Sequence, residues 1–413
     1  PGTQGGGGAG GGGWTLSGMY AGGKGGDGAV NFSYAVDGST DSPEGPIFFH
    51  NENISWTIAS GATTITPMAD ADFPDGPLCP GAVYLDGYVF VMTQTGRIYN
   101  SAIEDPTSWG ALDFITAASN PDYGVALSKQ LNYIVAFSTY STQFFYNAGQ
   151  PTGSPLLLNQ TANTNVGCAN GHSVVAFDNT IAWVGQSTTH GRGVYLLEGL
   201  SAKKISTENI EKILDVDLMS NVRAFTMKLG GHTCYVLTLK DSNVTLVFDL
   251  EQQVWYQWSS WDGVLEQSNF FSAAFFARFN NLPYLLDDSS GLIYQASFNL
   301  YEDAGIPIKC SGYTAIQDSG TTKRKHYRRA EIIGDKTVAT LELSHSGSDY
   351  SDYTASRSVN LGAPRSQVVA LGSDRRRSWK WEVEGDVPIQ LDSLEVTFDI
   401  GGINPAEQQS GNL

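Results

Sequence analysis

The feature that most constrains this chain is a pair of apolar strands joined by a short polar turn, which recurs along much of the sequence. Five copies occupy residues 83–99, 127–146, 173–186, 223–250 and 273–294. Each copy carries an aromatic residue in its second strand, at Tyr88, Tyr133, Trp183, Tyr235 and Tyr284. The spacing of these aromatics, 45 to 52 residues, matches the length of a four-stranded propeller blade. The pattern therefore predicts an all-β protein built around a β-propeller of five to seven blades.

Composition and strand pattern divide the chain into four segments. Residues 1–28 are dominated by glycine, whose backbone entropy opposes packing, so they are expected to form a flexible arm. Residues 29–310 hold the strand repeats and are expected to form the propeller. From residue 311 the strands alternate cleanly between apolar and polar residues, as in SWKWEVEGD at 378–386. That alternation predicts a β-sandwich-like domain over 311–402, followed by a tail at 403–413.

Charge limits the classes of partner. The 413 residues carry a formal net charge of −18, with 11% aromatic and only 16% charged residues. A chain this apolar is not disordered, and its few charges indicate surface buried against other chains. A strongly acidic protein repels nucleic acid, which disfavours a sequence-reading DNA binder but suits an axial channel, lined by carboxylates, through which DNA slides. No long apolar run or signal peptide is found, so we expect a soluble chain from a reducing compartment.

Motifs for catalysis, cofactors and metals are missing from the sequence. The cysteines Cys79, Cys168, Cys234 and Cys310 form no CxxC pair, which excludes a zinc ribbon and favours isolated buried thiols. GMYAGGKG at 18–25 has Gly25 where a phosphate-binding loop needs Ser or Thr. DADFPDG at 70–76 fits a plain turn better than a calcium loop. No catalytic, cofactor or metal residue is predicted, although a propeller could gather a distant acid pair at its axis.

One short helix is predicted, within SAKKISTENIEKIL at 201–214. Ser206 or Thr207 can cap its first turn, which also contains Glu208 and Glu211. Ile210 lies on the apolar face and is expected to point inward. The segment is too short to be a domain, so it predicts a buried corner between strands.

Two basic runs stand out in this acidic chain. The first contains Lys323, Arg324, Lys325, Arg328 and Arg329, and the second is 375–377. Three interpretations remain open: a solvated strand edge protected by cations, a contact with an acidic neighbouring subunit, and a contact with DNA phosphates. We take the five residues of the first run as candidate subunit-interface residues.

Residues 165–214 contain several short motifs in a defined order. They are Gly167-Cys168, Asp178-Asn179, Trp183-Val184-Gly185, Gly193-Val194-Tyr195 and Ile205-Ser206-Thr207 with Ile210-Glu211. Together with segments at 105–122 and 141–149, this order resembles the packaged-DNA stabilisation proteins of short-tailed bacteriophages. The C-terminal stretch 376–402 is also similar to that family.

The resemblance implies a structural protein of the phage tail, assembled in the host cytoplasm, and neither an enzyme nor a membrane-anchored or cofactor-binding protein. It implies a homohexameric hub or nozzle that joins the head-to-tail adaptor to the tail needle or tip, beside tail fibre or spike proteins. The hub closes the DNA channel after packaging and lets DNA pass at ejection without binding it specifically. The resemblance also implies structural roles for the motif residues Gly167, Cys168, Asp178, Trp183, Gly185, Ser206, Thr207, Ile210 and Glu211.

Two other functions are compatible with a propeller. A carbohydrate-binding or carbohydrate-cleaving propeller, such as a receptor-binding tail protein, would use Trp255, Trp258 and Trp261 as sugar platforms. Packing in the core or at an interface is the simpler expectation for these three residues. A propeller that binds other proteins, of the type found in eukaryotes, is the third possibility.

Overall fold

The computed structural model describes residues 47–50, 53–58, 65–117, 122–150, 152–162, 164–177, 179–189, 191–262, 267–288, 290–297, 301–303, 305–385 and 387–401. The predicted arm at 1–28 and tail at 403–413 lie outside these residues. Antiparallel sheets make up nearly all of the regular structure, which confirms the all-β class. The chain divides into two units, one of residues 1–259 and 269–295 and the other of residues 260–268 and 296–413.

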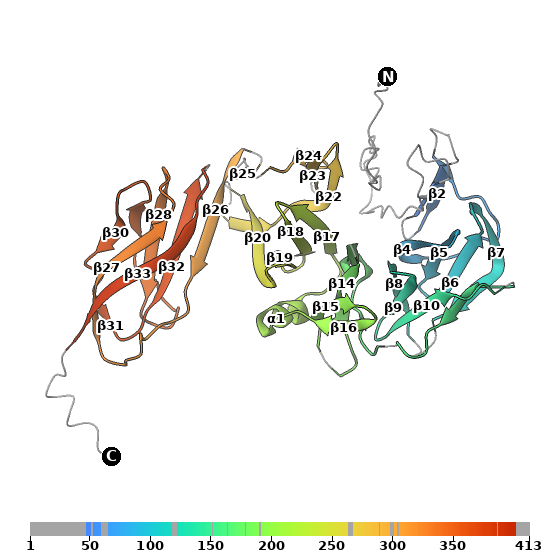
Figure 1. Cartoon of the computed structure of the whole chain (residues 1–413), viewed down its shortest axis with the longest axis horizontal. Coiled ribbons are helices and arrows are strands. Elements are labelled where there is room, and N and C mark those ends of the chain that lie inside the picture. The colour runs from blue at the N-terminus through green and yellow to red at the C-terminus, as the bar shows by residue number, and fades with distance from the viewer. Residues whose placement is uncertain are drawn as a thin grey trace, which may run out of the picture. The chain divides into compact units, whose positions relative to one another are not determined.

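The first unit contains six sheets among its described residues, each formed by strands that follow one another in the chain (Figure 1). The first sheet is β1 (Ile47–His50), β2 (Ser55–Ile58) and β3 (Thr66–Pro67). The second is β4 (Leu78–Leu85), β5 (Tyr88–Thr93), β6 (Arg97–Ala102) and β7 (Asp105–Thr116). The third is β8 (Gly124–Gln130), β9 (Tyr133–Ser138), β10 (Thr142–Asn147) and β11 (Leu156–Leu158).

The remaining three sheets follow the same order. The fourth has β12 (Gly167–Cys168), β13 (Val175–Phe177), β14 (Thr180–Gln186), β15 (Gly193–Glu198) and β16 (Ser201–Lys204), with the 3-10 helix η1 (Gly171–Ser173). The fifth has β17 (Val222–Leu229), β18 (His232–Leu239), β19 (Val244–Asp249), β20 (Val254–Asp262) and β21 (Gln267–Phe270). The sixth has β22 (Ala273–Phe279), β23 (Leu282–Asp287) and β24 (Ile293–Gln295).

Consecutive sheets are held together by apolar clusters between their faces. Each of five clusters contains buried or partly buried residues from two successive sheets. In chain order, representative pairs are Phe48 and Trp109, Phe90 and Ile134, Phe137 and Trp183, Val184 and Tyr235, and Val236 and Phe276. Face-to-face packing of successive antiparallel sheets is the arrangement of propeller blades. Within the described residues, no cluster joins the sixth sheet back to the first, so closure of the ring stays a prediction.

The aromatic repeat marks the sheets but not their register. Tyr88 and Tyr133 are the first residues of β5 and β9, whereas Trp183 and Tyr235 are the fourth residues of β14 and β18, and Tyr284 is the third of β23. All five lie in the second strand of the repeat, but the last three are shifted by two or three residues. The spacing of the aromatics therefore identifies successive sheets but not equivalent positions within them, because register is set by the turn before each strand.

The second unit consists of two sheets that enclose a common core. One sheet orders β25 (Glu302–Asp303), β26 (Ile306–Tyr313), β32 (Ser378–Gly385), β28 (Thr340–Ser346) and β29 (Arg357–Asn360). In the other, β27 (Lys325–Gly334) pairs with β30 (Ser366–Val369), β31 (Ser373–Asp374) and β33 (Leu391–Ile400). Tyr327 and Leu341 are buried between them. Because β26 pairs with β32, the unit begins before the predicted boundary at residue 311.

The predicted helix begins where the expected cap residues indicated, directly after Thr207. Residues 201–204 form strand β16, and α1 runs from Glu208 to Val216. Ile210 and Leu214 are buried, as the apolar face predicted. Within the described residues, no helix is long and apolar enough to span a membrane.

The predicted side-chain cap of α1 is wrong. Thr207 is the N-cap residue, but its side chain makes no capping hydrogen bond. Ser206 Oγ instead donates to Glu211 Oε1 at 2.9 Å. The hydroxyl of Ser206 therefore binds the Glu211 side chain and does not accept a hydrogen bond from the free N–H groups of the helix.

Replacing Thr207 by alanine is expected to change the free energy of unfolding by less than about 0.5 kcal/mol, because no cap bond is lost. Ile210→Ala, at the third residue of the helix, is expected to cost about 2–4 kcal/mol through the cavity it leaves. Chemical denaturation of the two variants measures both values. A loss of a full kilocalorie in Thr207→Ala would show that the hydroxyl does cap the helix in solution.

Candidate interaction surface

The second unit brings the two basic runs together. Strand β27 pairs with β31, with Lys325 opposite Asp374 and His326 opposite Ser373. The run at 375–377 directly follows β31, so it lies beside the start of β27. The solvent-accessible members of both runs define a basic surface, made of Lys323, Arg324, Arg328, Arg329, Arg375 and Arg376. The sequence identified each run but could not show that they are neighbours.

Lys325, one of the five candidate interface residues, is not part of this surface. Its side chain is fully buried. The ammonium donates to the carbonyl oxygens of Thr321 at 2.5 Å, Lys323 at 3.3 Å and Arg375 at 2.6 Å. A buried cation is tolerated when its donors are satisfied, and here three carbonyls do so. Lys325 joins the two basic runs from beneath and is not available to a neighbouring chain.

Several cations of the basic surface are neutralised within the unit. Arg328 pairs with Asp399, Arg376 pairs with Asp349, and Arg329 Nε lies 3.7 Å from Glu331. Among the described residues, Lys323 and Arg324 have no carboxylate within ion-pair distance. These two exposed residues therefore carry the uncompensated positive charge at this edge, where cations also block edge-to-edge strand pairing.

Arg377 anchors the second run in the core. Its guanidinium lies 3.9 Å from the ring centroid of Tyr327 and 5.2 Å from that of Trp379. Nε donates to Asp374 Oδ2 at 2.9 Å, and Nη2 donates to the carbonyl of Leu371 at 2.9 Å. Burial lowers the pKa of Arg377, while the Asp374 carboxylate opposes that shift. The side chain is a structural cation, since it is almost fully enclosed.

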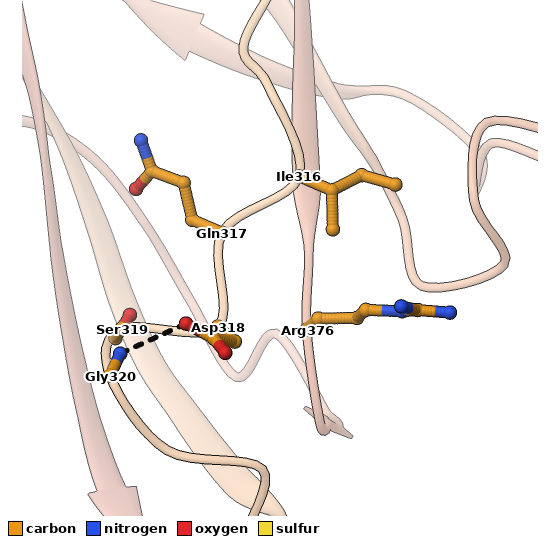
Figure 2. Close-up of a pocket in the computed structure, with 6 residues that line it drawn as sticks. All are labelled: Ile316, Gln317, Asp318, Ser319, Gly320 and Arg376. Carbon is orange, nitrogen blue, oxygen red and sulfur yellow. Dashed lines mark hydrogen bonds between the residues drawn. The ribbon is translucent and has the colours of Figure 1, made fainter.

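A shallow open pocket adjoins the basic surface. It is lined by the turn from Ile316 to Gly320 and by Arg376. Figure 2 shows the side chains of Ile316 and Arg376 extending to the same side, and the Asp318 carboxylate accepting from the Gly320 N–H at 3.0 Å. The lining offers one carboxylate and one guanidinium with no nucleophile and base in contact. Such a set suits a polar contact between chains better than a reaction.

A second pocket surrounds His345. Its lining includes Ser348, Tyr353 and Asp374. His345 Nδ1 lies 3.2 Å from Thr354 Oγ1, and Nε2 lies 4.0 Å from Asp374. Burial, helped by the nearby Arg377 charge, lowers the pKa of His345 to about 4. The imidazole is therefore neutral at physiological pH and packs against Trp379 as part of the core.

One group in the first unit has metal-ligand chemistry. His232, Asp249 and Glu251 offer ligand atoms within 4.8 Å of one another. Their atoms are already used locally: Asp249 Oδ1 accepts from the Glu251 N–H, Asp249 Oδ2 faces His232 Nδ1 at 2.7 Å, and Glu251 accepts from the Thr233 N–H. These hydrogen bonds stabilise the turn between β19 and β20, and they explain why the three side chains lie close together.

The first strands of four sheets in the first unit contain no acidic residue. The first strands of neighbouring sheets lie side by side, with β4 against β8 and β17 against β22. Their charged residues are Lys129, Arg223, Lys228 and Arg278, and these four strands contain no Asp or Glu. These strands supply no carboxylates, and the carboxylate lining of a DNA channel stays a prediction.

The motif residues of the fourth sheet are packing residues. Trp183 is fully buried, its ring centroid lies 5.1 Å from that of Phe137, and its Nε1 donates to the Gly167 carbonyl at 3.0 Å. A methyl group on Gly185 would lie 2.6 Å from the Tyr195 ring, and one on Gly167 would lie 2.4 Å from the Thr139 carbonyl oxygen. Only glycine fits these two close approaches.

The other motif residues hold the corner before α1. Burial raises the pKa of Cys168 to about 12, so its thiol is an inert core group. Glu211 pairs with Lys204 at 2.8 Å, and the hydrogen bond from Lys204 lowers the pKa of the carboxyl. Asp178 lies outside the described residues. Together these contacts give the motif a structural role in the fourth sheet and the corner that follows it.

Comparison with known families supports the same view of the first unit. Residues 25–300 match the phage stabilisation family, which is described as "Bacteriophage P22 Gp10, beta-propeller". The match covers well over half of the chain. The chain belongs to the phage stabilisation family. The resemblance noted in the sequence is thereby confirmed, and the six packed sheets are those of a propeller-type fold.

Other comparisons add little to this assignment. No curated protein is similar to the chain in sequence. The WD40 domain of Neurospora crassa Pan2 is 11% identical with a TM-score of 0.36, over 59% of this chain and 69% of that one. An exo-beta-1,3-galactanase from Phanerochaete chrysosporium, solved with galactose, is 9% identical with a TM-score of 0.30, over 90% of this chain and 100% of that one. Similarities this low carry no functional argument.

The three tryptophans considered as sugar platforms each contact other side chains of this chain. Trp255 packs on Phe248 at 5.0 Å between ring centroids, and its Nε1 donates to the Ile205 carbonyl at 2.9 Å. Trp258 packs edge-on against Phe271 at 5.5 Å. Trp261 lies under Lys309, with Nζ 4.4 Å from the ring centroid. Trp255 and Trp258 therefore pack against neighbouring aromatic rings, which is the simpler of the two roles considered for them.

Proposed function

We propose that this chain is the hub, or nozzle, of a short-tailed phage tail, where it joins the head-to-tail adaptor to the tail tip. In this role it closes the DNA channel after packaging, holds the tail needle or tip beside the fibre or spike proteins, and lets DNA pass at ejection. The observation that supports the proposal most strongly is the family match over residues 25–300. Family membership already makes the chain a phage structural protein. Its position in the tail is the part that we propose.

The charge distribution suits assembly into a ring. Each chain carries a formal net charge of −18, so copies brought together in a homohexamer repel one another. A local positive surface in the second unit would face an acidic neighbour and offset that repulsion. Such complementary pairs set the register of an interface more than they add affinity. We propose Lys323, Arg324, Arg328 and Arg329 as its contact residues, while Lys325 supports them from the core.

DNA is proposed to pass through the hub without a tight binding site. The chain as a whole is acidic, and long-range repulsion keeps a polyanion mobile. Retention of packaged DNA would then depend on the closed tail and not on affinity for this protein. Isolated protein that binds duplex DNA tightly, with affinity that falls steeply with salt, would contradict this part of the proposal.

Charge reversal tests the role of the basic surface. Lys323→Glu combined with Arg324→Glu is expected to yield filled heads that fail to gain or keep this protein and that lose their DNA. These two positions are chosen because both side chains are exposed and unpaired among the described residues. Protein composition of purified particles on a gel and the amount of retained DNA measure the effect.

A matched control separates assembly from folding. Lys203→Glu with Lys212→Glu reverses two exposed lysines of the first unit and is expected to leave incorporation and DNA retention unchanged. Both double variants should unfold at the parent's temperature, because surface substitutions of this kind change stability little. Normal incorporation of the Lys323/Arg324 variant would reject the basic surface as an assembly contact. A density map of intact tails then counts the copies in the ring.

A further inference from the structure

The fifth sheet of the first unit gathers one histidine and two carboxylates at one end. Strands β18, β19 and β20 are neighbours in this sheet (Figure 1). Cys234 of β18 pairs with Asp249 of β19, and residues that pair directly point to the same face. His232 lies two residues before Cys234 and therefore shares that face. Strand pairing thus brings His232 beside Asp249, which is 17 residues away in the chain, and beside Glu251 in the following turn.

The spacing of the three side chains is close to that of a metal site. His232 Nδ1 lies 2.7 Å from Asp249 Oδ2, and the ligand atoms of His232, Asp249 and Glu251 all lie within 4.8 Å of one another. Ligands bound to zinc at about 2.0–2.2 Å lie roughly 3.3 Å apart in a tetrahedral arrangement. The side chain of His232 is 44% exposed, and Glu251 is also exposed. Small rotations of these two side chains would therefore bring all three ligands to the required separation.

The backbone already orients both carboxylates. Asp249 Oδ1 accepts from the N–H groups of Glu251 at 2.9 Å and Gln252 at 3.2 Å. Glu251 Oε2 accepts from the N–H group of Thr233 at 2.7 Å. These bonds use one oxygen of each carboxylate and leave the other oxygen for a further partner. Hydrogen bonds that hold the ligating side chains in this way are typical of metal sites in proteins.

The charge of the cluster also favours a cation. Asp249 has a side chain only 6% exposed, and a carboxylate shielded from water needs a compensating partner. Among the described residues, no lysine or arginine lies within ion-pair distance of Asp249 or Glu251. His232 is the one partner with a positive form, and it offers a single charge to two carboxylates. A divalent cation would neutralise both.

We propose that His232 Nδ1, Asp249 Oδ2 and Glu251 Oε1 bind one zinc ion, with water completing its coordination. An imidazole combined with carboxylates suits zinc, whereas calcium and magnesium take oxygen ligands. Coordination through Nδ1 requires the tautomer of His232 that carries its proton on Nε2. The proton between Nδ1 and Asp249 is then lost from Nδ1, and Nε2 carries the imidazole proton in its place.

Such an ion would act as a structural clip at the end of the fifth sheet. His232 is the first residue of β18, Asp249 is the last residue of β19, and Glu251 lies in the turn to β20. One ion would therefore link the beginning of one strand to the end of the next and to the turn that follows. Because the unfolded chain does not hold these residues together, zinc binding is expected to stabilise the folded first unit.

Zinc binding by the isolated protein tests the proposal. After treatment with a chelator and its removal, calorimetric titration with Zn²⁺ is expected to show one ion bound per chain. The melting temperature of the first unit is expected to rise by about 5 °C when free zinc is 100 times the dissociation constant. Hydrogen exchange gives the local readout, since the amides of Thr233, Glu251 and Gln252 are expected to gain protection with zinc.

Three substitutions assign the binding to this cluster. His232→Asn can still donate a hydrogen bond to Asp249 but has no imidazole, and Glu251→Gln keeps an acceptor for the Thr233 N–H but loses the charge. Each is expected to weaken zinc binding by about tenfold or more. His326→Asn is the matched control, because it removes an exposed histidine of β27. Its affinity for zinc is expected to equal that of the parent.

Two results would overturn the proposal. One is equal zinc affinity in the parent, His232→Asn and Glu251→Gln, which would place any bound zinc elsewhere. The other is preference of the parent for Ca²⁺ over Zn²⁺, which would show that carboxylates bind the ion without the imidazole. The measurements use isolated protein, so their outcome is independent of the role proposed for the chain in the tail.

Discussion

Replacing Trp183 by alanine is expected to lower the free energy of unfolding of the first unit by about 4 kcal/mol. The side chain is fully buried and lies between two rings, Phe137 of the preceding sheet and Tyr195 of its own. Its removal would open a large cavity between the third and fourth sheets. It would also leave the Gly167 carbonyl without its 3.0 Å partner, which adds the cost of an unpaired buried acceptor.

Two further variants isolate the causes of that loss. Trp183→Phe keeps a ring in the site but removes the indole donor, and it is expected to cost about 1–2 kcal/mol. Tyr133→Ala removes a half-buried aromatic residue from the corresponding strand of the third sheet and serves as the control. Urea unfolding followed by far-ultraviolet circular dichroism measures the three values. If Trp183→Ala cost no more than Tyr133→Ala, Trp183 would not be the centre of this interface.

Replacing Lys325 by alanine is expected to destabilise the second unit by about 3 kcal/mol. The buried ammonium holds three carbonyl oxygens, from residues on both sides of the pairing between β27 and β31. Without it, those carbonyls have no donor and the turn at 321–325 is no longer tied to Arg375. The neighbouring Lys323 is exposed, so Lys323→Ala is expected to stay within about 0.5 kcal/mol of the parent.

Lys325→Met distinguishes hydrogen bonding from packing. Methionine keeps most of the aliphatic chain and removes the three donors, so it is expected to be nearly as destabilising as alanine. Thermal and chemical unfolding of the separate variants compare the values. A methionine variant as stable as the parent would show that the ammonium contributes little, and Lys325 would then return to the set of surface cations.

Much of the first unit could be predicted because its signals are local. A run such as VYLDGYVFVMTQTGRIY at 83–99 shows both strands and the turn between them, and similar runs recur at blade length. The motifs around Gly167, Trp183 and Gly185 were sufficient for the family resemblance. Inward packing of Ile210 also followed from sequence, since its place on one face of a short helix depends only on nearby residues.

Other features depend on contacts between distant residues. Lys325 is one lysine within a basic run, and no local pattern distinguishes it from Lys323. Its buried ammonium is held by the carbonyl oxygen of Arg375, which is 50 residues away in the chain. Thr207 has the composition of a cap, but the competing bond of Ser206 with Glu211 is a detail of side-chain geometry. The first sheet, β1–β3, belongs to none of the five repeats because its strands are short and irregularly spaced.

Local patterns were enough to predict the all-β class, the succession of sheets along the chain, the change in strand pattern near residue 311 and the family. These properties depend on alternation, turn residues and short motifs, which are read within a few residues of one another. The register of each sheet, the proximity of the two basic runs beside β27 and β31, and the burial of particular cations became visible in the folded chain alone. Those properties depend on pairings between strands far apart in the chain, for which a single sequence has no local signal.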